Sequence, residues 1–408
     1  MIQKVFVLLI LFGMLGWTSV ALAEDAEEVP SQQRAGFELT PTLLWQTQVV
    51  SSHAAFPRSE ANALPQLRFR RLRPGLELGL WEDRVRAELV VSVLPGELEL
   101  IEAHTSLELG ASHMLRVGQF KIPFMRYRMN SGTRLVLVDW SFHTEYIGGE
   151  RQLGVAFGND ARSNGVFRYE VGLFTGQNAR NSHGIGIGLL YGEALPHEPA
   201  ALVDAEREPY EGFDRPELAM HFGFALGGMD PSTIDDLERG DRLRAYIGAG
   251  ATLHDATPFI EHQMRSALEG MLKWRGWGLY TGVYHGMNMA FQHQDSISPF
   301  SGYGGVLGSA SYRFQSVPLS LGVRSSWLRL HEELVTDISI RAQSYGDLDR
   351  DRLRFFREHT AGGRWDAYQD IVSLGADVGV YTRGVRELPG GDRFSRGWMA
   401  RFQVQLRI

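Results

Sequence analysis

The stretch Trp398-Met399-Ala400-Arg401-Phe402-Gln403-Val404-Gln405-Leu406-Arg407-Ile408 ends the chain and gives its clearest structural signal. Apolar and polar residues alternate strictly from Ala400 to Ile408, with Trp398 and Phe402 on one face and Met399, Arg401 and Gln405 on the other. Period-two alternation predicts a β-strand with one apolar and one polar face. A strand of a membrane barrel has this form, with lipid outside and water inside, but a strand of a soluble sandwich can show it as well.

The same alternation recurs throughout the chain and predicts an all-β fold, a transmembrane antiparallel β-barrel of about 16 strands (14–18). A membrane barrel absorbs 408 residues in one closed sheet, and its half-apolar strands fit a composition of 44% apolar and 22% charged residues. The predicted strands are residues 36–50, 66–80, 83–94, 98–110, 114–121, 151–158, 166–175, 184–191, 217–227, 242–253, 264–275, 277–290, 302–315, 318–330, 370–383 and 394–408. This list leaves the long segments 192–216 and 331–369 at the end of the barrel where turns should be short.

The first residues predict export. Lys4 precedes the apolar run 5–20, and Ala21-Leu22-Ala23 is a small-x-small cleavage site followed by acidic residues. We expect a signal peptide over residues 1–23 cleaved after Ala23, a short periplasmic segment over 24–35, and an outer-membrane barrel over 36–408. An uncleaved anchor helix is the alternative, although the run is short for a membrane span of about 20 residues.

Composition excludes several classes of function. The chain has no cysteine, which excludes disulfides, thiolate metal sites and a cysteine nucleophile. The formal net charge is −7, and loss of Lys4 with the signal peptide lowers it by one, which argues against nucleic acid as a partner. No Gly-x-Ser-x-Gly motif or helical His pair suggests an enzyme, and no cofactor or metal is expected. Asp347, Asp349, Asp351 and Glu358 partly match a calcium loop, but Arg352 stands where glycine is required.

Two features of the pattern have more than one interpretation. Glycines recur inside the predicted strands, which suggests tight curvature or close backbone approach. Large aromatic residues gather near the predicted strand ends, where an interfacial girdle would place them, and core packing is the alternative. They are Trp45, Trp81, Trp274, Trp277, Tyr280, Tyr284, Tyr303, Trp327 and Trp398.

Three stretches resemble the phosphate-selective porin O and P family: 67–73 (LRFRRLR), 116–124 (RVGQFKIPF) and 150–155 (ERQLGV). The resemblance implies a sixteen-stranded trimeric barrel with an inward loop near 121–150 and an anion pathway lined by basic residues. On that analogy the pore constriction holds Lys121, Arg126, Arg128 and Arg134. The chain departs from the family in three ways: its net charge is negative, it has only three lysines, and its last residue is Ile408.

Arginines at the polar positions of the predicted strands form the expected lumen wall. They are Arg68, Arg70, Arg84, Arg86, Arg116, Arg401 and Arg407. Glu38, Glu88 and Glu170 also stand at polar positions of the predicted strands, and their negative charges offset those of the arginines. The sequence therefore does not decide whether the pore prefers anions or cations. Asp139, Glu145 and Glu150 oppose the basic residues of the inward loop in the same way.

The sequence therefore predicts a porin, a passive diffusion channel for small polar or anionic solutes, with phosphate-like anions among the candidates. The expected partners are outer-membrane lipid and lipopolysaccharide, small solutes and two further copies of the chain in a homotrimer. The first alternative is a non-conducting barrel acting as an adhesin or structural protein, motivated by the segments 192–216 and 331–369. The second is a barrel hydrolase.

Overall fold

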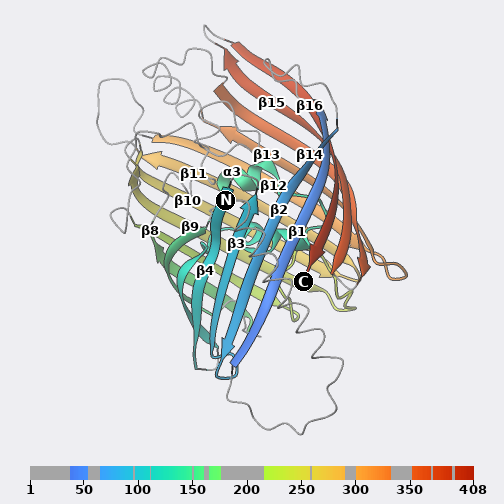
Figure 1. Ribbon diagram of the computed structural model, residues 1–408. Coiled ribbons are helices and arrows are strands. Elements are labelled where there is room, and N and C mark those ends of the chain that lie inside the picture. Colours follow the sequence, from blue (N-terminus) through green and yellow to red (C-terminus); the bar gives the residue numbers. More distant parts are fainter. Residues whose placement is uncertain are drawn as a thin grey trace.

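The computed structural model describes residues 37–53, 65–94, 97–110, 112–148, 151–159, 165–175, 216–257, 260–289, 300–331, 352–368, 371–387 and 391–408. These residues form a closed antiparallel β-barrel of 16 strands in which each strand pairs with the next and β1 pairs with β16. The strands are β1 (Phe37–His53), β2 (Gln66–Leu80), β3 (Val85–Leu94), β4 (Glu97–Leu109), β5 (His113–Lys121), β6 (Arg151–Gly158), β7 (Phe167–Phe174), β8 (Glu217–Leu226), β9 (Arg244–Thr257), β10 (Ile260–Trp274), β11 (Trp277–Met289), β12 (Phe300–Arg313), β13 (Leu319–Leu330), β14 (Arg352–Tyr368), β15 (Val372–Glu387) and β16 (Gly391–Arg407). The predicted fold class is confirmed (Figure 1).

The two faces of the wall follow the alternation of the sequence. On β16 the outward Phe402 is 45% exposed, whereas the inward Gln403 and Gln405 are buried. The side-chain amides of Gln46 and Gln48 on β1 donate hydrogen bonds to the amide oxygens of Gln405 and Gln403, each at 2.7 Å, and so link the first strand to the last. Among the described residues no helix is long and apolar enough to cross a membrane.

The predicted strand list needs two changes. The predicted strand 184–191 lies outside the described residues, and β7 pairs directly with β8, so the wall passes from Phe174 to Glu217 without it. The segment 331–369, predicted as a connection, contains β14. This strand escaped prediction because Arg357 and His359 occupy outward positions that are apolar in most other strands. The number of strands was therefore right although the list was not.

The corrected list explains the lengths of the connections. At the end of the barrel where β1 begins and β16 ends, most connections are short: 81–84, 110–112, 159–166, 275–276, 314–318 and 369–371. The long connections 54–65, 122–150, 175–216, 290–299 and 331–351 all leave the opposite end. Short turns at one end and long loops at the other are typical of outer-membrane barrels. The one long connection at the turn end is 227–243.

The lumen is partly filled by an apolar core. Tyr280, Tyr284 and Tyr303 are buried within it, so the girdle interpretation is wrong for these three residues. Their rings need space along the wall, and glycine supplies it: a Cβ added at Gly282 would overlap the Tyr284 ring, and one at Gly286 would overlap Tyr303. The glycines of the strands thus mark close approach, as the sequence suggested.

Candidate pore and its inward loop

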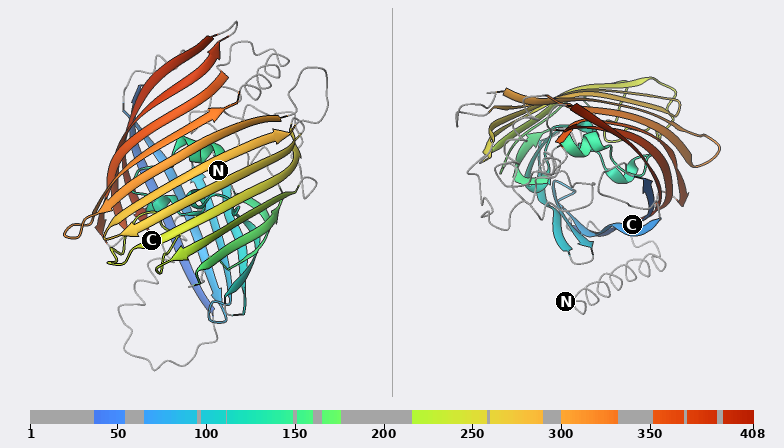
Figure 2. Two further views of the ribbon diagram at one scale, coloured as in Figure 1. Left: turned by 180° about the vertical axis from the view of Figure 1, so that it is seen from behind. Right: turned by 90° about the horizontal axis from the view of Figure 1, so that it is seen from above.

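The connection between β5 and β6 folds into the barrel. Its described part, residues 122–148, contains the short helices α2 (Arg126–Met129), η1 (Gly132–Arg134) and α3 (Phe142–Ile147). Viewed from above, the helices lie inside the ring of strands (Figure 2). Residues 122–148 therefore lie in the lumen, and the contacts that hold this inward loop decide how much of the lumen it occupies.

Three carboxylates of the wall bind the backbone of the inward loop. Glu269 of β10 accepts hydrogen bonds from the backbone N–H groups of Arg126 (2.7 Å) and Tyr127 (3.3 Å). Glu358 of β14 accepts one from Phe142 (2.9 Å) at the start of α3. These carboxylates take the place of water as acceptors for the backbone N–H groups of the loop. Hydrogen bonds to charged groups stabilise a fold more than hydrogen bonds between neutral groups.

The third wall carboxylate completes the series. Asp377 of β15 accepts a hydrogen bond from the backbone N–H of Val138 (2.9 Å) and pairs with Arg401 of β16 at 2.8 Å. Arg401 was predicted to line the lumen, and it does so as the partner of this anchor. The loop is thus held at both ends and in its middle by strands on the far side of the barrel.

One carboxylate of the loop, in turn, binds side chains of the wall. Asp139 pairs with Arg70 (2.8 Å) and Arg71 (3.2 Å), which are consecutive residues of β2. A β-bulge lies where β2 pairs with Gln46 and Thr47 of β1, and it turns both arginines inward. Burial disfavours the charge of Asp139, but the guanidinium groups of Arg70, Arg71 and Arg401 outweigh it and hold the pKa of this carboxyl well below its usual value.

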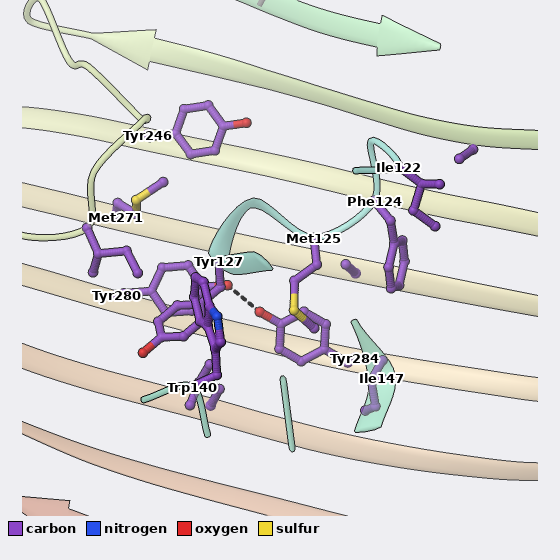
Figure 3. Close-up of a cluster of buried hydrophobic side chains, with 14 of the residues drawn as sticks. Ile122, Phe124, Met125, Tyr127, Trp140, Ile147, Tyr246, Met271, Tyr280 and Tyr284 are labelled. Atoms are coloured by element: carbon purple, nitrogen blue, oxygen red, sulfur yellow. Dashed lines mark hydrogen bonds between the residues drawn. The ribbon is translucent and has the colours of Figure 1, made fainter. Parts of the chain in front are cut away.

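Aromatic rings fill the space between the loop and one side of the wall (Figure 3). The ring of Tyr127 packs against Trp140 (5.3 Å between centroids) and against Tyr280 of β11 (4.8 Å). The hydroxyls of Tyr280 and Tyr284 hydrogen-bond to each other and to the carboxylate of Glu269. Further buried apolar residues on β8 to β14 extend this cluster along that side of the lumen.

A second segment enters from the turn end of the barrel. The connection 227–243 buries Met229 and Ile234, and the Lys273 amine of β10 donates to the Asp230 carbonyl (2.8 Å) and the Thr233 hydroxyl (2.7 Å). Asp235 accepts a hydrogen bond from the backbone of Val136 in the inward loop. The two inserted segments therefore meet inside the barrel, on the same side as the aromatic cluster.

The opposite wall carries charges that retain contact with solvent. The side chain of Glu88 on β3 is 38% exposed, and that of Arg116 on β5 is 20% exposed. Arg116 lies 3.4 Å from Glu170, and the Arg151 guanidinium donates to Glu102 at 2.5 Å. Charges such as Glu88 and Arg116 on this wall thus keep contact with solvent, whereas Glu269 and Lys273 on the opposite wall are buried against the inserted segments.

The four predicted constriction residues lie in different environments. The Lys121 amine donates to the carbonyls of Met129 (3.3 Å) and Asn130 (2.8 Å), so it braces the loop from its first residue. Arg126 is buried with its guanidinium 5.6 Å from the centre of the Tyr246 ring, and Arg128 lies 5.5 Å from Trp140. Arg134, in η1, is exposed. Glu145 and Glu150 lie outside the described side chains.

The arginines predicted to form the lumen wall also lie in different environments. Arg68 donates to Gln48 (2.8 Å), and Arg70, Arg116 and Arg401 face inward as described above. Arg84 lies in the turn between β2 and β3, Arg86 pairs with Asp83 near that turn, and Arg407 is exposed at the last residue of β16.

Sequence reasoning missed most of the anchors. Arg71 has the wrong parity unless the bulge is known, and Glu358 lies in the strand that was not predicted. Because Glu358 bonds Arg324 (2.6 Å) and the start of α3, it is no calcium ligand; Asp347, Asp349 and Asp351 lie outside the described residues. Among the described residues no group of three His, Asp or Glu side chains is placed to hold a metal ion.

No protein-family model and no curated protein matches the chain. Solved structures of similar shape are outer-membrane porins. The outer membrane channel DcaP of Acinetobacter baumannii aligns with a TM-score of 0.57 at 10% identity, over 93% of this chain and 100% of that one. OmpF of Salmonella typhi aligns at 0.53 and 9% identity, over 92% and 98%. An anion-selective porin from Comamonas acidovorans aligns at 0.52 and 9% identity, over 91% and 100%. At such identities the likeness shows a shared fold.

Proposed function

We propose that the chain is an outer-membrane porin, a passive diffusion channel for small polar and anionic solutes. One observation carries this proposal: carboxylates on β10, β14 and β15 hold the backbone of the inward loop at that side, while charged side chains on the wall of β2 to β7, such as Glu88 and Arg116, keep contact with solvent. Water and solutes then pass between the loop and that charged wall. A porin needs no chemical step, only a lumen of fixed width and charge.

The charged wall is ordered in rows by the strand register. Glu77, Glu88 and His104 are direct neighbours on β2, β3 and β4. The adjacent inward row toward the turn end contains Arg86 and Arg116. Solutes moving along this wall meet an acidic row and a basic row in succession. In a lumen of low-dielectric walls such a field discriminates between solutes by charge.

The preference for anions rests on the loop side of this passage. Lys121, Arg128 and Arg151 lie at or beside the entry of the inward loop, and the runs 67–73, 116–124 and 150–155 that resemble the phosphate-selective porin O and P family supply part of this region. The resemblance supports phosphate-like anions as the preferred solutes. It also supports assembly as a homotrimer, and the sequence of residues 1–23 supports export with cleavage after Ala23.

A reversal-potential measurement tests selectivity. Purified, refolded protein in a planar bilayer under a potassium chloride gradient should give a reversal potential of the sign expected for anions, and phosphate should reduce the chloride current. Replacing Glu88 by Gln should strengthen the anion preference, and Thr105→Val on the outward face of β4 is the matched control. A cation-selective potential in the wild-type protein would refute the anion preference.

The second candidate is a non-conducting barrel. The meeting of the two inserted segments through Asp235 and Val136 favours it, because it shows that part of the lumen is filled from both ends. The two candidates differ in one outcome: a folded protein of the second kind gives no current steps in a bilayer.

A further inference from the structure

The outer wall of the barrel carries an unusual group of arginines. Arg329 of β13, Arg357 of β14 and Arg396 of β16 all point outward and are exposed. On β6 to β10 the outward positions near the same, loop-bearing end are apolar: Leu153, Leu173, Leu218, Leu253 and Met264. If this surface faces hydrocarbon, as the proposed function requires, an arginine there needs an anionic partner or water.

The strand register brings the three arginines together. Arg357 pairs across the sheet with Trp327 on one side and with Thr382 of β15 on the other, and Thr382 pairs with Arg396. Arg329 stands two residues beyond Trp327 and is therefore a diagonal neighbour of Arg357. We name the surface formed by Arg329, Arg357 and Arg396 the outer arginine patch; it lies on the orange and red strands of Figure 1.

Aromatic rings frame the outer arginine patch. The Arg357 guanidinium lies 5.4 Å from the centre of the Trp327 ring and 6.0 Å from Phe355, and Phe355 packs against Phe394 (5.4 Å). Within the part of the chain that the structure describes, none of the three arginines has an acidic partner within ion-pair distance. The rings thus contact the guanidinium group of Arg357, whose side chain stays exposed on the outer surface.

The depth of the patch in the membrane follows from strand length. A strand crosses the hydrocarbon layer with about 9–11 residues. Trp365 is exposed on the outer face near the turn end of β14, where the rule for aromatic belts places the turn-side interface. Arg357 precedes it by eight residues, which places the guanidinium at the opposite interface. That interface is the loop-bearing one. Long loops face outward in outer-membrane barrels, so the patch lies at the headgroup level of the outer leaflet.

We propose that the outer arginine patch binds the phosphate groups of a phosphorylated glycolipid of the outer leaflet, lipopolysaccharide, with its acyl chains on the apolar wall below. The site rests on the proposed membrane location but not on conduction. Guanidinium groups suit it because they bind phosphate with two parallel hydrogen bonds. Three of them at one interface match a headgroup that carries more than one phosphate, and the aromatic rings match the junction of sugar and acyl chain.

The test compares matched variants of the full, refolded protein in detergent. Binding of bisphosphorylated lipid A, of the same lipid with its phosphates removed, and of inorganic phosphate is measured by native mass spectrometry. The patch variant carries Arg329→Gln with Arg357→Gln. The control variant carries Arg242→Gln with Arg275→Gln, two exposed arginines at the turn end. Both variants lose the same charge.

The proposal predicts that wild-type and control proteins bind bisphosphorylated lipid A at least about tenfold more tightly than the dephosphorylated lipid, and that the patch variant loses this difference. Equal binding of both lipids by the wild type would overturn it. So would equal affinity of inorganic phosphate, which would indicate a site for the free anion, or a change of oligomeric state in the patch variant alone, which would indicate that the patch faces a second copy. Bilayer conductance of the patch variant is recorded in parallel; normal conductance with lost lipid preference separates this site from the channel function.

Discussion

At the scale of single residues, the position of the inward loop depends on a one-residue irregularity in β2. The bulge opposite Gln46 and Thr47 directs both Arg70 and Arg71 to Asp139. Strict alternation assigns Arg71 to the outer face, so the sequence pattern predicted Arg70 as a lumen residue and missed its neighbour. Bulges arise from the pairing of two strands, and a single strand's sequence does not display them.

Replacing Asp139 by Asn should loosen the inward loop. The change leaves two inward arginines without their carboxylate, and removal of one partner from a buried ion pair costs about 3–5 kcal/mol. Because the pKa of Asp139 is depressed in the folded protein, its stabilising effect is present above its ordinary pKa of about 4 and is lost only as the pH falls further. Urea unfolding at pH 7 measures the loss, with Glu82→Gln, an exposed carboxylate in the turn between β2 and β3, as control. Equal unfolding midpoints for Asp139→Asn and the wild type would contradict the anchoring role.

His143 of α3 should make the loop sensitive to acid. Burial against Tyr284 and Gly305 lowers the pKa of this imidazole to about 3. Its folded-state pKa lies below the unfolded value of about 6.5, so stability falls as the pH drops below about 6.5 and continues to fall until about 3. At pH 5 the cost is about 2 kcal/mol, from 1.36 kcal/mol per pKa unit.

His143→Leu removes the titrating group and keeps an apolar side chain. The difference in unfolding free energy between pH 7.5 and pH 5 should be smaller in this variant than in the wild type by about that amount. His113→Leu, at the turn end of β5, provides the control. If all three proteins respond equally to acid, the buried imidazole is not the sensor.

At the scale of elements, alternation predicts the strands whose outer face is apolar and fails where it is not. β16 was evident because apolar and polar residues alternate from Ala400 to Ile408, and β13 because apolar residues stand at its outward positions 319, 321, 323 and 327. β14 was hidden by Arg357 and His359 on its outer face, which are part of or close to the outer arginine patch. The strand that was not predicted thus carries part of the proposed lipid site. This is expected, because functional residues often depart from the local sequence pattern.

The segment 227–243 gave no signal beyond its length. Its role as a second insert depends on contacts with Lys273 and Val136, which are distant in sequence. Replacing residues 229–241 by two glycines should preserve the β8–β9 hairpin and open the filled side of the lumen. We expect the unit conductance to rise roughly twofold, because the passage widens at the turn end. An unchanged conductance would show that this segment does not restrict the pore.

At the scale of the whole molecule, the closed barrel, its strand number and its inward loop were predictable, because each strand repeats the same alternation and the loop follows a recognisable run at 116–124. The clamping of the loop was not predictable. It depends on Glu269, Glu358 and Asp377, which stand on three strands far from the loop in sequence and meet it only after closure. Long-range carboxylate-to-backbone contacts leave no periodic trace in the chain.

The absence of native cysteine makes the central claim directly measurable. Single cysteines at Glu88 on the charged wall, at Leu307 in the filled side and at Phe222 on the outer face are tested in planar bilayers with a charged, membrane-impermeant methanethiosulfonate reagent. We predict discrete current steps for all three proteins and a reagent-induced reduction of current for the cysteine at position 88 alone. A folded protein that passes no current, or a reduction at position 307 with none at position 88, would contradict a water path along the wall of β2 to β7.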